Sequence, residues 1–448
     1  MKNVLIIAYD FPPYNSVGAL RPKSWFDHMH EFKIFPIIVT RNWISTGDNV
    51  YDYISESPNK IPEISKSKNG IIIKSPYKPN LANLIYLKCG NNKFSIIRKT
   101  ISLYFEIFQY ILNVGPKKEI YLAANEFLKS NRVDLILATG EPFVLFHYAK
   151  KLSLKYKTPW IADFRDPWHN NLNRGPLFKR IIFDKFLEKK IIKTALSIIT
   201  VSELFKKYLK ETHPKKNIKI VSNGYDSFAI KETEGIKQNK EVLNISYVGT
   251  LYKWHPINVI FETLTKVVKK HSDFKFVFNL YGINNIEEIK QVILSSYPEI
   301  NHLVRFFPKQ DNLTLIKDLR KSNLLLLFNY YNFMGTKIYD YLGLNRKILF
   351  CFKNDKEAKF LKEKFYNYKV DAKFNFHPQI NLLEKTNSGI IIEDKHHLYK
   401  ALVQLNEVFK TNKLIPSTKN NFSNYSRREQ CKLLCENIIS SLDNIKAI

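Results

Sequence analysis

Clusters of charged, glycine and histidine residues follow apolar segments at several points in this chain. In one of them, Asp163-Phe164-Arg165-Asp166, three charges follow an apolar run. An arginine in such a place can bind a phosphate or a carboxylate through two parallel hydrogen bonds. The two carboxylates lie three positions apart, which is not the DxD spacing of a metal site. We expect Asp163 and Arg165 to be catalytic, and the alternative is an internal ion pair that braces the loop.

A lysine and an aspartate mark the start of a predicted helix. The pair Gly335-Thr336 is typical of a helix start, which places Lys337 in the first turn. The helix dipole disfavours a cation there, unless an anion such as a diphosphate shares the site. Asp340 lies on the same helical face, where its carboxylate could bind two ribose hydroxyls. A surface pair between Lys337 and Asp340 is the alternative.

Two glycines are placed where a phosphate could bind. Gly18 ends a loop that contains two prolines, and Gly249 ends the apolar run 243–249. A glycine lets the backbone approach a ligand closely, and backbone N–H groups at a helix start can hold a phosphate. Lys253 would add positive charge beside Gly249. The alternatives are an ordinary loop, a packing glycine and a surface lysine.

A histidine follows the run Thr139-Gly140-Glu141-Pro142. Pro142 is typical of the first turn of a helix, so His147 falls about one turn further along. An imidazole can donate or accept a proton near neutral pH, which makes His147 a candidate catalytic residue. The alternative is a half-buried histidine that is bonded to a backbone carbonyl.

The elements that must position these clusters alternate between short apolar strands and longer amphipathic helices, such as 142–156 and 176–194. Strands are predicted at 4–9, 35–40, 70–75, 133–139, 159–164, 196–202 and 218–223, and then at 243–249, 275–282, 303–308, 324–329, 347–352 and 389–393. Buried strands that alternate with helices predict a parallel, doubly wound sheet. The two series of strands predict two domains.

A polar stretch separates the two series of strands. Residues 227–241 show no strand pattern and are interpreted as a linker between an N-terminal domain at 1–226 and a second domain at 242–417. A helical segment at 418–448 is expected to pack back on the first domain. Because ligands bind at the carboxyl ends of the strands in such sheets, we expect two doubly wound Rossmann-like α/β domains that face each other across a cleft.

The chain carries a large positive charge. Its 70 Lys and Arg residues against 41 Asp and Glu give a net charge of +29 among 448 residues. Residues 1–226 hold 36 basic and 19 acidic residues, so the excess is spread through folded segments. Such a charge favours nucleic acid, anionic membrane or phosphorylated substrates as partners, and surface lysine from an AT-rich genome is the alternative. No nucleic-acid-binding motif is present, so we expect no nucleic acid partner.

A basic and aromatic segment within 81–130 is the candidate region for an acceptor or a membrane surface. One predicted helical face carries Ile101, Tyr104, Phe105, Phe108, Ile111 and Leu112. Basic residues at 88, 93, 98 and 99 precede it. Such a face belongs either to the core or to a helix that lies on anionic lipid headgroups.

Cysteine usage and hydropathy indicate a cytoplasmic protein. The four cysteines form no CxxC pair and no metal-ligand spacing with histidine, which predicts a reducing compartment. The first apolar run stops at Asp10 and is too short for a signal peptide. No run approaches the roughly 18 apolar residues of a membrane-spanning helix. We expect a soluble protein, or one bound peripherally at the inner face of the cytoplasmic membrane.

Taken in order, these motifs resemble glycosyltransferase family 4, a group of two-domain enzymes with the GT-B fold. The resemblance covers nearly the whole chain and rests on DFPPYNSVGALRP, TGEPF with His147, WIADFRDPW, IITVS, IVSNGYD, YVGTLY and GTKIYDYLGLNRKIL. It implies a retaining glycosyltransferase that needs neither a metal nor a cofactor besides its nucleotide-sugar co-substrate. The nucleotide-diphosphate sugar would bind the second domain, and a glycan or lipid-linked acceptor the first, in cell-surface polysaccharide biosynthesis.

The resemblance also implies roles for single residues. Gly18 matches a glycine near the donor phosphates, and Gly249 matches the first glycine of the second domain. Thr250 stands where an arginine commonly follows that glycine. Lys337 matches the lysine of a K-x-x-E variant, in which Asp340 replaces the usual Glu.

We therefore expect His147, Asp163 and Arg165 to be catalytic, and a second set to bind the donor: Gly18, Gly249, Thr250, Lys253, Lys337 and Asp340. The missing arginine leaves open a catalytically weak or inactive binding protein with the same fold. A basic nucleic-acid-binding protein is the least favoured alternative.

Overall fold

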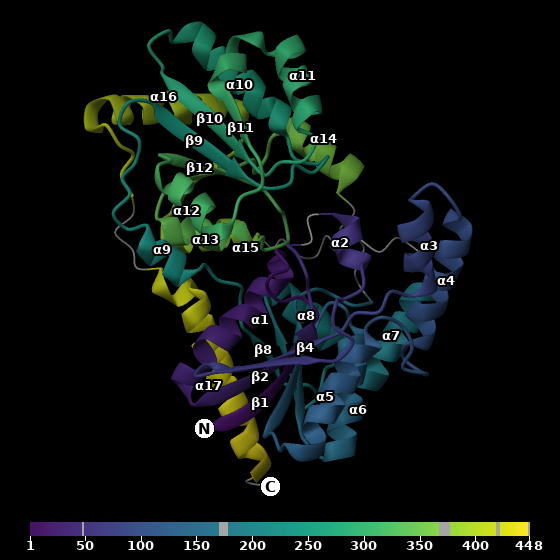
Figure 1. The fold of residues 1–448 in the computed structure, drawn as a ribbon. Helices are drawn as coiled ribbons and strands as arrows, with labels where there is room; N and C mark the ends of the chain where they lie inside the picture. The colour runs from purple at the N-terminus through teal and green to yellow at the C-terminus, as the bar shows by residue number, and fades with distance from the viewer. Residues whose placement is uncertain (47–48, 170–177, 367–376, 418–421, 447–448) are drawn as a thin grey trace. The chain divides into compact units, whose positions relative to one another are not determined.

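The computed structural model describes residues 1–46, 49–169, 178–366, 377–417 and 422–446. The chain divides into two compact units, one formed by Met1–Asn223 with Arg427–Ile448 and the other by Gly224–Ser426 (Figure 1).

The expected linker at 227–241 lies within the second unit and contains a helix, α9 (Ser227–Glu232). Two interactions hold this helix in place. The Asp226 carboxylate accepts the backbone N–H groups of Phe228 and Ala229, and Arg320 donates to the Ile230 carbonyl over 3.0 Å. Most of the segment's polar side chains stay outside, which is why the sequence pattern suggested a linker.

The first unit contains an eight-stranded sheet in which all neighbouring strands are parallel except β3 and β4. In spatial order its strands are β3 (Glu63–Ser67), β4 (Gly70–Ser75), β2 (Ile34–Arg41), β1 (Lys2–Ile7), β5 (Leu135–Gly140), β6 (Trp160–Phe164), β7 (Ser197–Thr200) and β8 (Ile218–Ile220).

Helices cover both faces of this sheet. The helices of the first unit are α1 (Val17–His28), α2 (Val50–Ile54), α3 (Leu81–Cys89), α4 (Ser95–Phe108), α5 (Lys118–Ser130), α6 (Val144–Tyr156), α7 (Phe178–Ile192), α8 (Glu203–Thr212) and α17 (Arg427–Lys446), with a short 3-10 helix η1 (Met29–Phe32). Along β1, Val4 and Ile6 pack in one core with residues of α1 and α17, whereas Leu5 and Ile7 pack in another with residues of α5 and α6. This alternation makes the unit doubly wound, as predicted.

The second unit contains a six-stranded, fully parallel sheet. In spatial order its strands are β11 (Val304–Phe307), β10 (Phe276–Tyr281), β9 (Leu243–Val248), β12 (Leu324–Phe328), β13 (Lys347–Cys351) and β14 (Gly389–Ile392). Besides α9, its helices are α10 (Ile257–Lys270), α11 (Ile286–Ser296), η3 (Pro298–Leu303), α12 (Asn312–Arg320), α13 (Lys337–Leu344), α14 (Lys356–Phe365), α15 (Pro378–Thr386), α16 (Lys395–Asn412) and η4 (Ser423–Tyr425).

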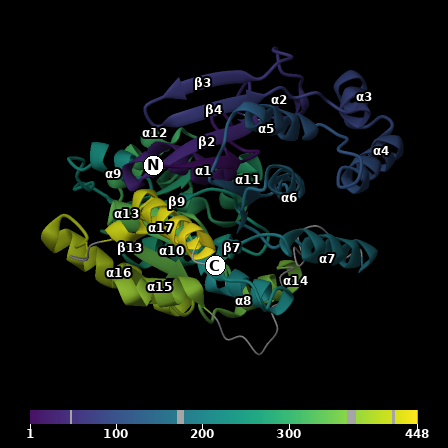
Figure 2. The ribbon, with the colours of Figure 1, turned by 90° about the horizontal axis from the view of Figure 1, so that it is seen from below.

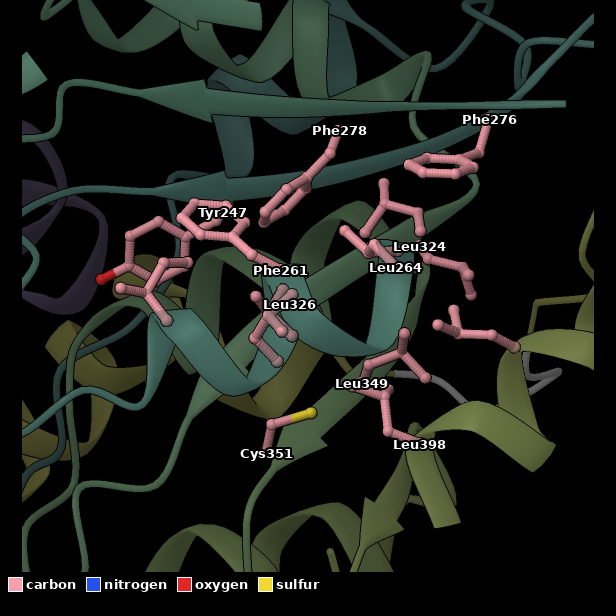
Figure 3. Packing of buried hydrophobic residues seen from close by; sticks show 14 of the residues in the cluster. Tyr247, Phe261, Leu264, Phe276, Phe278, Leu324, Leu326, Leu349, Cys351 and Leu398 are labelled. Atoms are coloured by element: carbon pink, nitrogen blue, oxygen red, sulfur yellow. The ribbon is translucent and has the colours of Figure 1, made fainter. Parts of the chain in front are cut away.

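The core of the second unit is likewise split between the two faces of its sheet. Leu324 and Leu326 of β12 pack with Phe261 and Leu264 of α10, as Figure 3 shows. The residue between them, Leu325, packs in the opposite core with residues of α12 and α13. Each strand predicted from its apolar run is present, with ends within two residues of the expected bounds, except that β8 ends three residues before the expected residue 223.

The C-terminal helix α17 returns to the first unit and packs against α1. Cys431 and Cys435, one turn apart, are buried there as free thiols, and the Gln430 side chain accepts the Ser222 backbone N–H over 2.8 Å. Of the expected C-terminal segment, residues 418–421 and 447–448 lie outside the described residues. Within the described ranges, no helix has the length and apolar character needed to cross a membrane.

A buried carboxylate ties three elements of the first unit together. Glu188 of α7 lies 2.7 Å from His169 Nδ1, after β6, and 3.0 Å from His213 Nε2, at the end of α8. Burial alone would raise the pKa of Glu188, but the hydrogen bonds with the two imidazoles outweigh it and lower this pKa below its ordinary 4.5.

Replacing Glu188 by glutamine is expected to lower the free energy of unfolding by about 2 kcal/mol at pH 7. Because the folded pKa is depressed, the ionised Glu188 stabilises the fold above pH 4.5, and this contribution is lost as the pH falls through the folded pKa. The deficit of the variant should therefore shrink at pH 4 in urea denaturation. Glu126→Gln, at an exposed glutamate of α5, is the control and should change stability little; equal stability of the Glu188 variant and wild type at pH 7 would contradict this account.

Candidate functional site

Polar groups of the first unit gather where β1, β5 and β6 end. After β6, Arg165 donates from Nε to the Gly140 carbonyl over 2.7 Å and from Nη2 to the Glu141 carbonyl over 2.8 Å. The same Nη2 lies 4.0 Å from Asp10 Oδ2 after β1. Burial raises the pKa of Asp10, and the charge of Arg165 partly offsets this rise. Arg165 is thus fixed at the carboxyl edge of the sheet.

Gly18 lies in the first turn of α1, against this pair. A Cβ at position 18 would collide with the Arg165 guanidinium and with the Asp10 carboxylate. The helix begins at the cap Ser16, whose side chain accepts the Ala19 N–H and donates to Asp10 over 3.2 Å. The structure therefore brings together two residues singled out from the sequence, Gly18 and Arg165, at a helix start.

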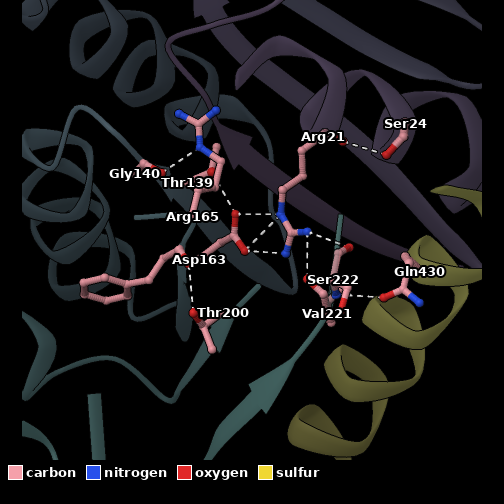
Figure 4. A network of polar contacts seen from close by, with 11 residues as sticks. Arg21, Ser24, Thr139, Gly140, Asp163, Arg165, Thr200, Val221, Ser222 and Gln430 are labelled. Carbon is pink, nitrogen blue, oxygen red and sulfur yellow. Dashed lines mark hydrogen bonds and ion pairs between the residues drawn. The ribbon is translucent and has the colours of Figure 1, made fainter. Parts of the chain in front are cut away.

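Asp163 is more buried than Arg165 and belongs to the network of polar contacts in Figure 4. It is fully buried, accepts hydrogen bonds from Arg21 Nε and Nη2, the latter over 2.7 Å, and accepts the Thr139 hydroxyl over 2.8 Å. Arg21 also donates to the Val221 carbonyl over 2.8 Å. These contacts favour the alternative to a catalytic role, an internal ion pair that braces the loop. The partner of Asp163 in this pair is Arg21 rather than Arg165.

His147 lies on α6, in different surroundings. Its ring is half-buried and contacts Tyr110 edge-on, at 5.8 Å between centroids. Burial, together with Lys150, Lys151 and Lys190, lowers its pKa to about 4, and its Nε2 has no hydrogen-bond partner. The imidazole is therefore neutral at pH 7 and can accept a hydrogen bond. Among the residues that the structure describes, no hydrogen bond or ring contact joins His147 to Arg165.

In the second unit, the structure places Lys337 directly over Gly249. Gly249 follows β9 with a φ of +98°, a conformation that favours glycine. A Cβ there would coincide with Lys337 Nζ, so only glycine leaves room for the ammonium. Lys337 is the first residue of α13, which has no side-chain N-cap hydrogen bond. A strand end, a helix N-terminus and a cation thus converge.

The Lys337 ammonium makes no hydrogen bond or ion pair with any residue that the structure describes. It lies 5.9 Å from the centre of the Tyr247 ring. Burial lowers its pKa to about 8, and the charge of Asp340 partly offsets the shift. A half-buried, unpaired ammonium at a helix N-terminus is unfavourable on its own and would be stabilised by an anion.

An aromatic cluster that sequence reasoning missed lies beside this lysine. It comprises Tyr247, Tyr252, Trp254, His255, Phe328 and Tyr330. The Tyr252 N–H points to His255 Nδ1 over 3.2 Å, so Nε2 carries the proton of the neutral ring. The His255 Nε2–H is buried and has no hydrogen-bond partner. Burial, together with the charge of Lys337, lowers the pKa of His255 to about 3. In the sequence, the run Tyr252-Lys253-Trp254-His255 shortly after Gly249 was the one feature that could have indicated this cluster.

The remaining predicted donor-binding residues are more peripheral. Thr250 is exposed and its backbone carbonyl accepts the Tyr247 hydroxyl over 2.8 Å. Lys253 is exposed. Asp340 is half-buried in the first turn of α13, where its charge acts on Lys337. In the described ranges, no group of three or more His, Cys, Asp or Glu side chains is arranged to hold a metal ion.

No protein-family model and no curated protein sequence matches the chain. Solved structures do match it along its whole length. The sucrose-phosphate synthase of Thermosynechococcus elongatus is 11% identical, with a TM-score of 0.56, over 100% of this chain and 98% of that one. The alpha,alpha-trehalose-phosphate synthase (UDP-forming) of Burkholderia xenovorans, in complex with glucose-6-phosphate, is 10% identical, with a TM-score of 0.57, over 99% and 100%. Anabaena HepE, in complex with UDP-glucose, is 10% identical, with a TM-score of 0.51, over 98% and 100%.

At these identities the likeness shows the fold. The chain has the GT-B fold of two Rossmann-like α/β domains, which confirms the predicted fold class. The narrower resemblance to family 4 stays a prediction.

Proposed function

We propose that this protein is a retaining, family 4-like glycosyltransferase. It moves a sugar from a nucleotide-diphosphate sugar to a glycan or lipid-linked acceptor in cell-surface polysaccharide biosynthesis, in the cytoplasm. The observation that carries the proposal is the unpaired Lys337 ammonium, which lies over Gly249 at the N-terminus of α13. The complexes with UDP-glucose and glucose-6-phosphate among proteins of the same fold support it.

In this proposal the second unit holds the donor. Lys337, the backbone N–H groups at the start of α13 and the His255 Nε2–H offer hydrogen bonds to the diphosphate. Asp340 accepts hydrogen bonds from ribose hydroxyls. Negative charge grows on the diphosphate as the bond to the sugar breaks, so donors fixed in place stabilise the leaving group. Thr250 and Lys253 stay at the rim.

The first unit would supply the acceptor side. Arg165, held by Gly140 and Glu141, is a fixed cation that can orient a charged or polar acceptor. His147 is neutral and can accept a hydrogen bond from a hydroxyl. In the transfer, the bond from the anomeric carbon to the diphosphate breaks, the acceptor oxygen bonds to that carbon on the same face, and the acceptor's proton passes to the departing phosphate. No metal is required, because the cations and N–H groups take its place.

Binding of nucleoside diphosphates to the full chain tests the proposal. We expect calorimetry with UDP, ADP and GDP to find at least one diphosphate that binds more tightly than its nucleoside, equally well with and without EDTA. No heat from any of them would contradict the proposal.

The alternative is a GT-B-fold binding protein with weak or no catalysis. One observation favours it, because Thr250 replaces an arginine and its exposed side chain adds no charge near Gly249. Diphosphate binding without any release of nucleoside diphosphate from a bound donor would select this alternative.

Replacing Gly18 by alanine is expected to lower the transfer rate about tenfold or more. The new methyl group must displace the Arg165 guanidinium and the Asp10 carboxylate, whose flexible ends can move. The effect should therefore appear in the release of nucleoside diphosphate rather than in thermal stability. Gly235→Ala is the matched control, because a Cβ there meets no atom within 4 Å. An unchanged rate in Gly18→Ala would remove this cluster from the mechanism.

A further inference from the structure

Helix α4 leaves four apolar side chains on a face that the first unit does not cover, whereas Ile101, Phe105 and Phe108 of the face predicted from the sequence are half-buried. No residue of α4 is buried. Ile96, Leu103 and Tyr104 are 78%, 54% and 45% exposed. Together with Ile97, they fall within about 120° of one another around the helix axis. A helix of a globular protein normally turns such a stripe toward the core, so its exposure requires an explanation.

The neighbouring helix carries further exposed apolar side chains. Figures 1 and 2 both show α3 beside α4 at the edge of the first unit, away from its sheet, and the two helices are in contact. On α3, Leu81 and Leu84 are exposed, as is Phe94 just before α4. We call the exposed side chains of Leu81, Leu84, Phe94, Ile96, Ile97, Leu103 and Tyr104 the α3–α4 surface.

Basic residues lie on the same two helices as the α3–α4 surface and in the loop between them. Its basic neighbours are Lys88, Lys93, Arg98 and Lys99. The acidic residue of α4, Glu106, is paired with Arg180 of α7 at 3.1 Å. Arg98, Lys99 and Arg180 line an open hollow of about 860 Å³ whose other walls are mostly asparagine and serine. The apolar stripe therefore borders a cationic, hydrogen-bonding hollow.

We propose that the α3–α4 surface docks this protein on a lipid bilayer that contains anionic phospholipid. The apolar stripe enters the boundary between headgroups and acyl chains, and the flanking cations contact headgroup phosphates. Charge complementarity favours a membrane over a second copy of this chain, because two copies would bring equal positive charge face to face. The proposal rests on the proposed function in one respect, since a lipid-linked acceptor would be met at this surface.

Vesicle co-sedimentation tests this docking without any donor. The full chain is mixed with vesicles of phosphatidylcholine alone, or of phosphatidylcholine with 30% phosphatidylglycerol. We expect binding to the anionic vesicles to be at least about tenfold stronger, and to weaken at high salt. Ile96→Ser with Leu103→Ser, and separately Lys93→Gln with Lys99→Gln, should each lower the partition coefficient about tenfold or more.

The matched control changes the same residue types elsewhere on the first unit. Ile61→Ser with Lys66→Gln removes an exposed isoleucine and an exposed lysine near β3 and should bind as wild type does. All changed side chains are exposed, so thermal unfolding should be unaltered and should confirm that each variant folds.

Three results would overturn the docking proposal. The first is that wild type does not bind anionic vesicles. The second is that the α3–α4 variants bind them as strongly as the control variant does. Sedimentation velocity could instead show self-association that Ile96→Ser with Leu103→Ser abolishes, which would make the surface a contact between copies. Vesicle binding without any nucleotide binding would overturn the proposed function alone, and the reverse pattern would overturn the docking alone.

Discussion

Replacing Lys337 by methionine is expected to lower both nucleoside diphosphate affinity and the transfer rate about 100-fold or more. Methionine keeps the apolar stem of the side chain but removes the ammonium that lies over Gly249. A fixed donor aimed at a developing negative charge is typically worth about 10²–10³ in rate. Calorimetry with nucleoside diphosphates and an assay of diphosphate release measure the two effects. Lys317→Met, at an exposed lysine of α12, is the control and should change neither.

The pH dependence gives a second measure of Lys337. Burial lowers its pKa to about 8 in the free protein, so the ammonium is present below pH 8 and is lost above it. If only the charged form binds the diphosphate, affinity should fall by up to about tenfold per pH unit above 8. Lys337→Arg keeps its charge at high pH and should remove this fall. A wild-type affinity that stays flat from pH 7 to pH 10 would contradict the assignment.

Replacing Asp163 by alanine is expected to destabilise the first unit by about 3–5 kcal/mol. The change leaves the Arg21 guanidinium buried without its carboxylate, and a buried charge that has lost its partner is costly. It also removes the acceptor of the Thr139 hydroxyl. Denaturation followed by tryptophan fluorescence measures the effect, because Trp25, Trp43, Trp160 and Trp168 lie in the first unit and only Trp254 of the 5 lies in the second.

A double change separates the brace from a direct chemical role. Arg21→Met with Asp163→Leu removes both charges and should recover part of the lost stability. Asp166→Ala is the control, because this neighbouring aspartate has an exposed side chain. If Asp163→Ala unfolds as wild type does but loses all transfer, the brace is wrong and Asp163 acts on the substrate.

The strands could be predicted because strands that are buried on both faces of a parallel sheet have continuous Ile- and Val-rich sequences. Strand β3 was missed, because its sequence, Glu-Ile-Ser-Lys-Ser, is polar and mostly exposed at the edge of the sheet. The short helix α9 was missed for a similar reason. Its buried residues, Ala229 and Ile230, are too few to produce a helical period.

The candidate site could be predicted only in part. Glycine after a strand and lysine at a helix start indicated Gly249 and Lys337, and the parallel sheet brings these distant positions together. The partner of Asp163 could not be predicted, because Arg21 lies 142 positions away and only the fold brings the two together. The aromatic cluster around His255 was missed because its members come from two strand ends and the loops that follow them.

The central claim, transfer of a sugar from a nucleotide-diphosphate donor, is tested most directly by following that donor by ³¹P and ¹H NMR. The full chain is incubated with a panel of nucleotide sugars and with candidate glycan or lipid-linked acceptors, in the presence of EDTA. We expect one donor to release its nucleoside diphosphate as a new glycosidic linkage appears with the same anomeric configuration, and Lys337→Met to suppress both signals. A donor that binds but stays intact with every acceptor, at stoichiometric protein, would contradict the claim and identify a binding protein.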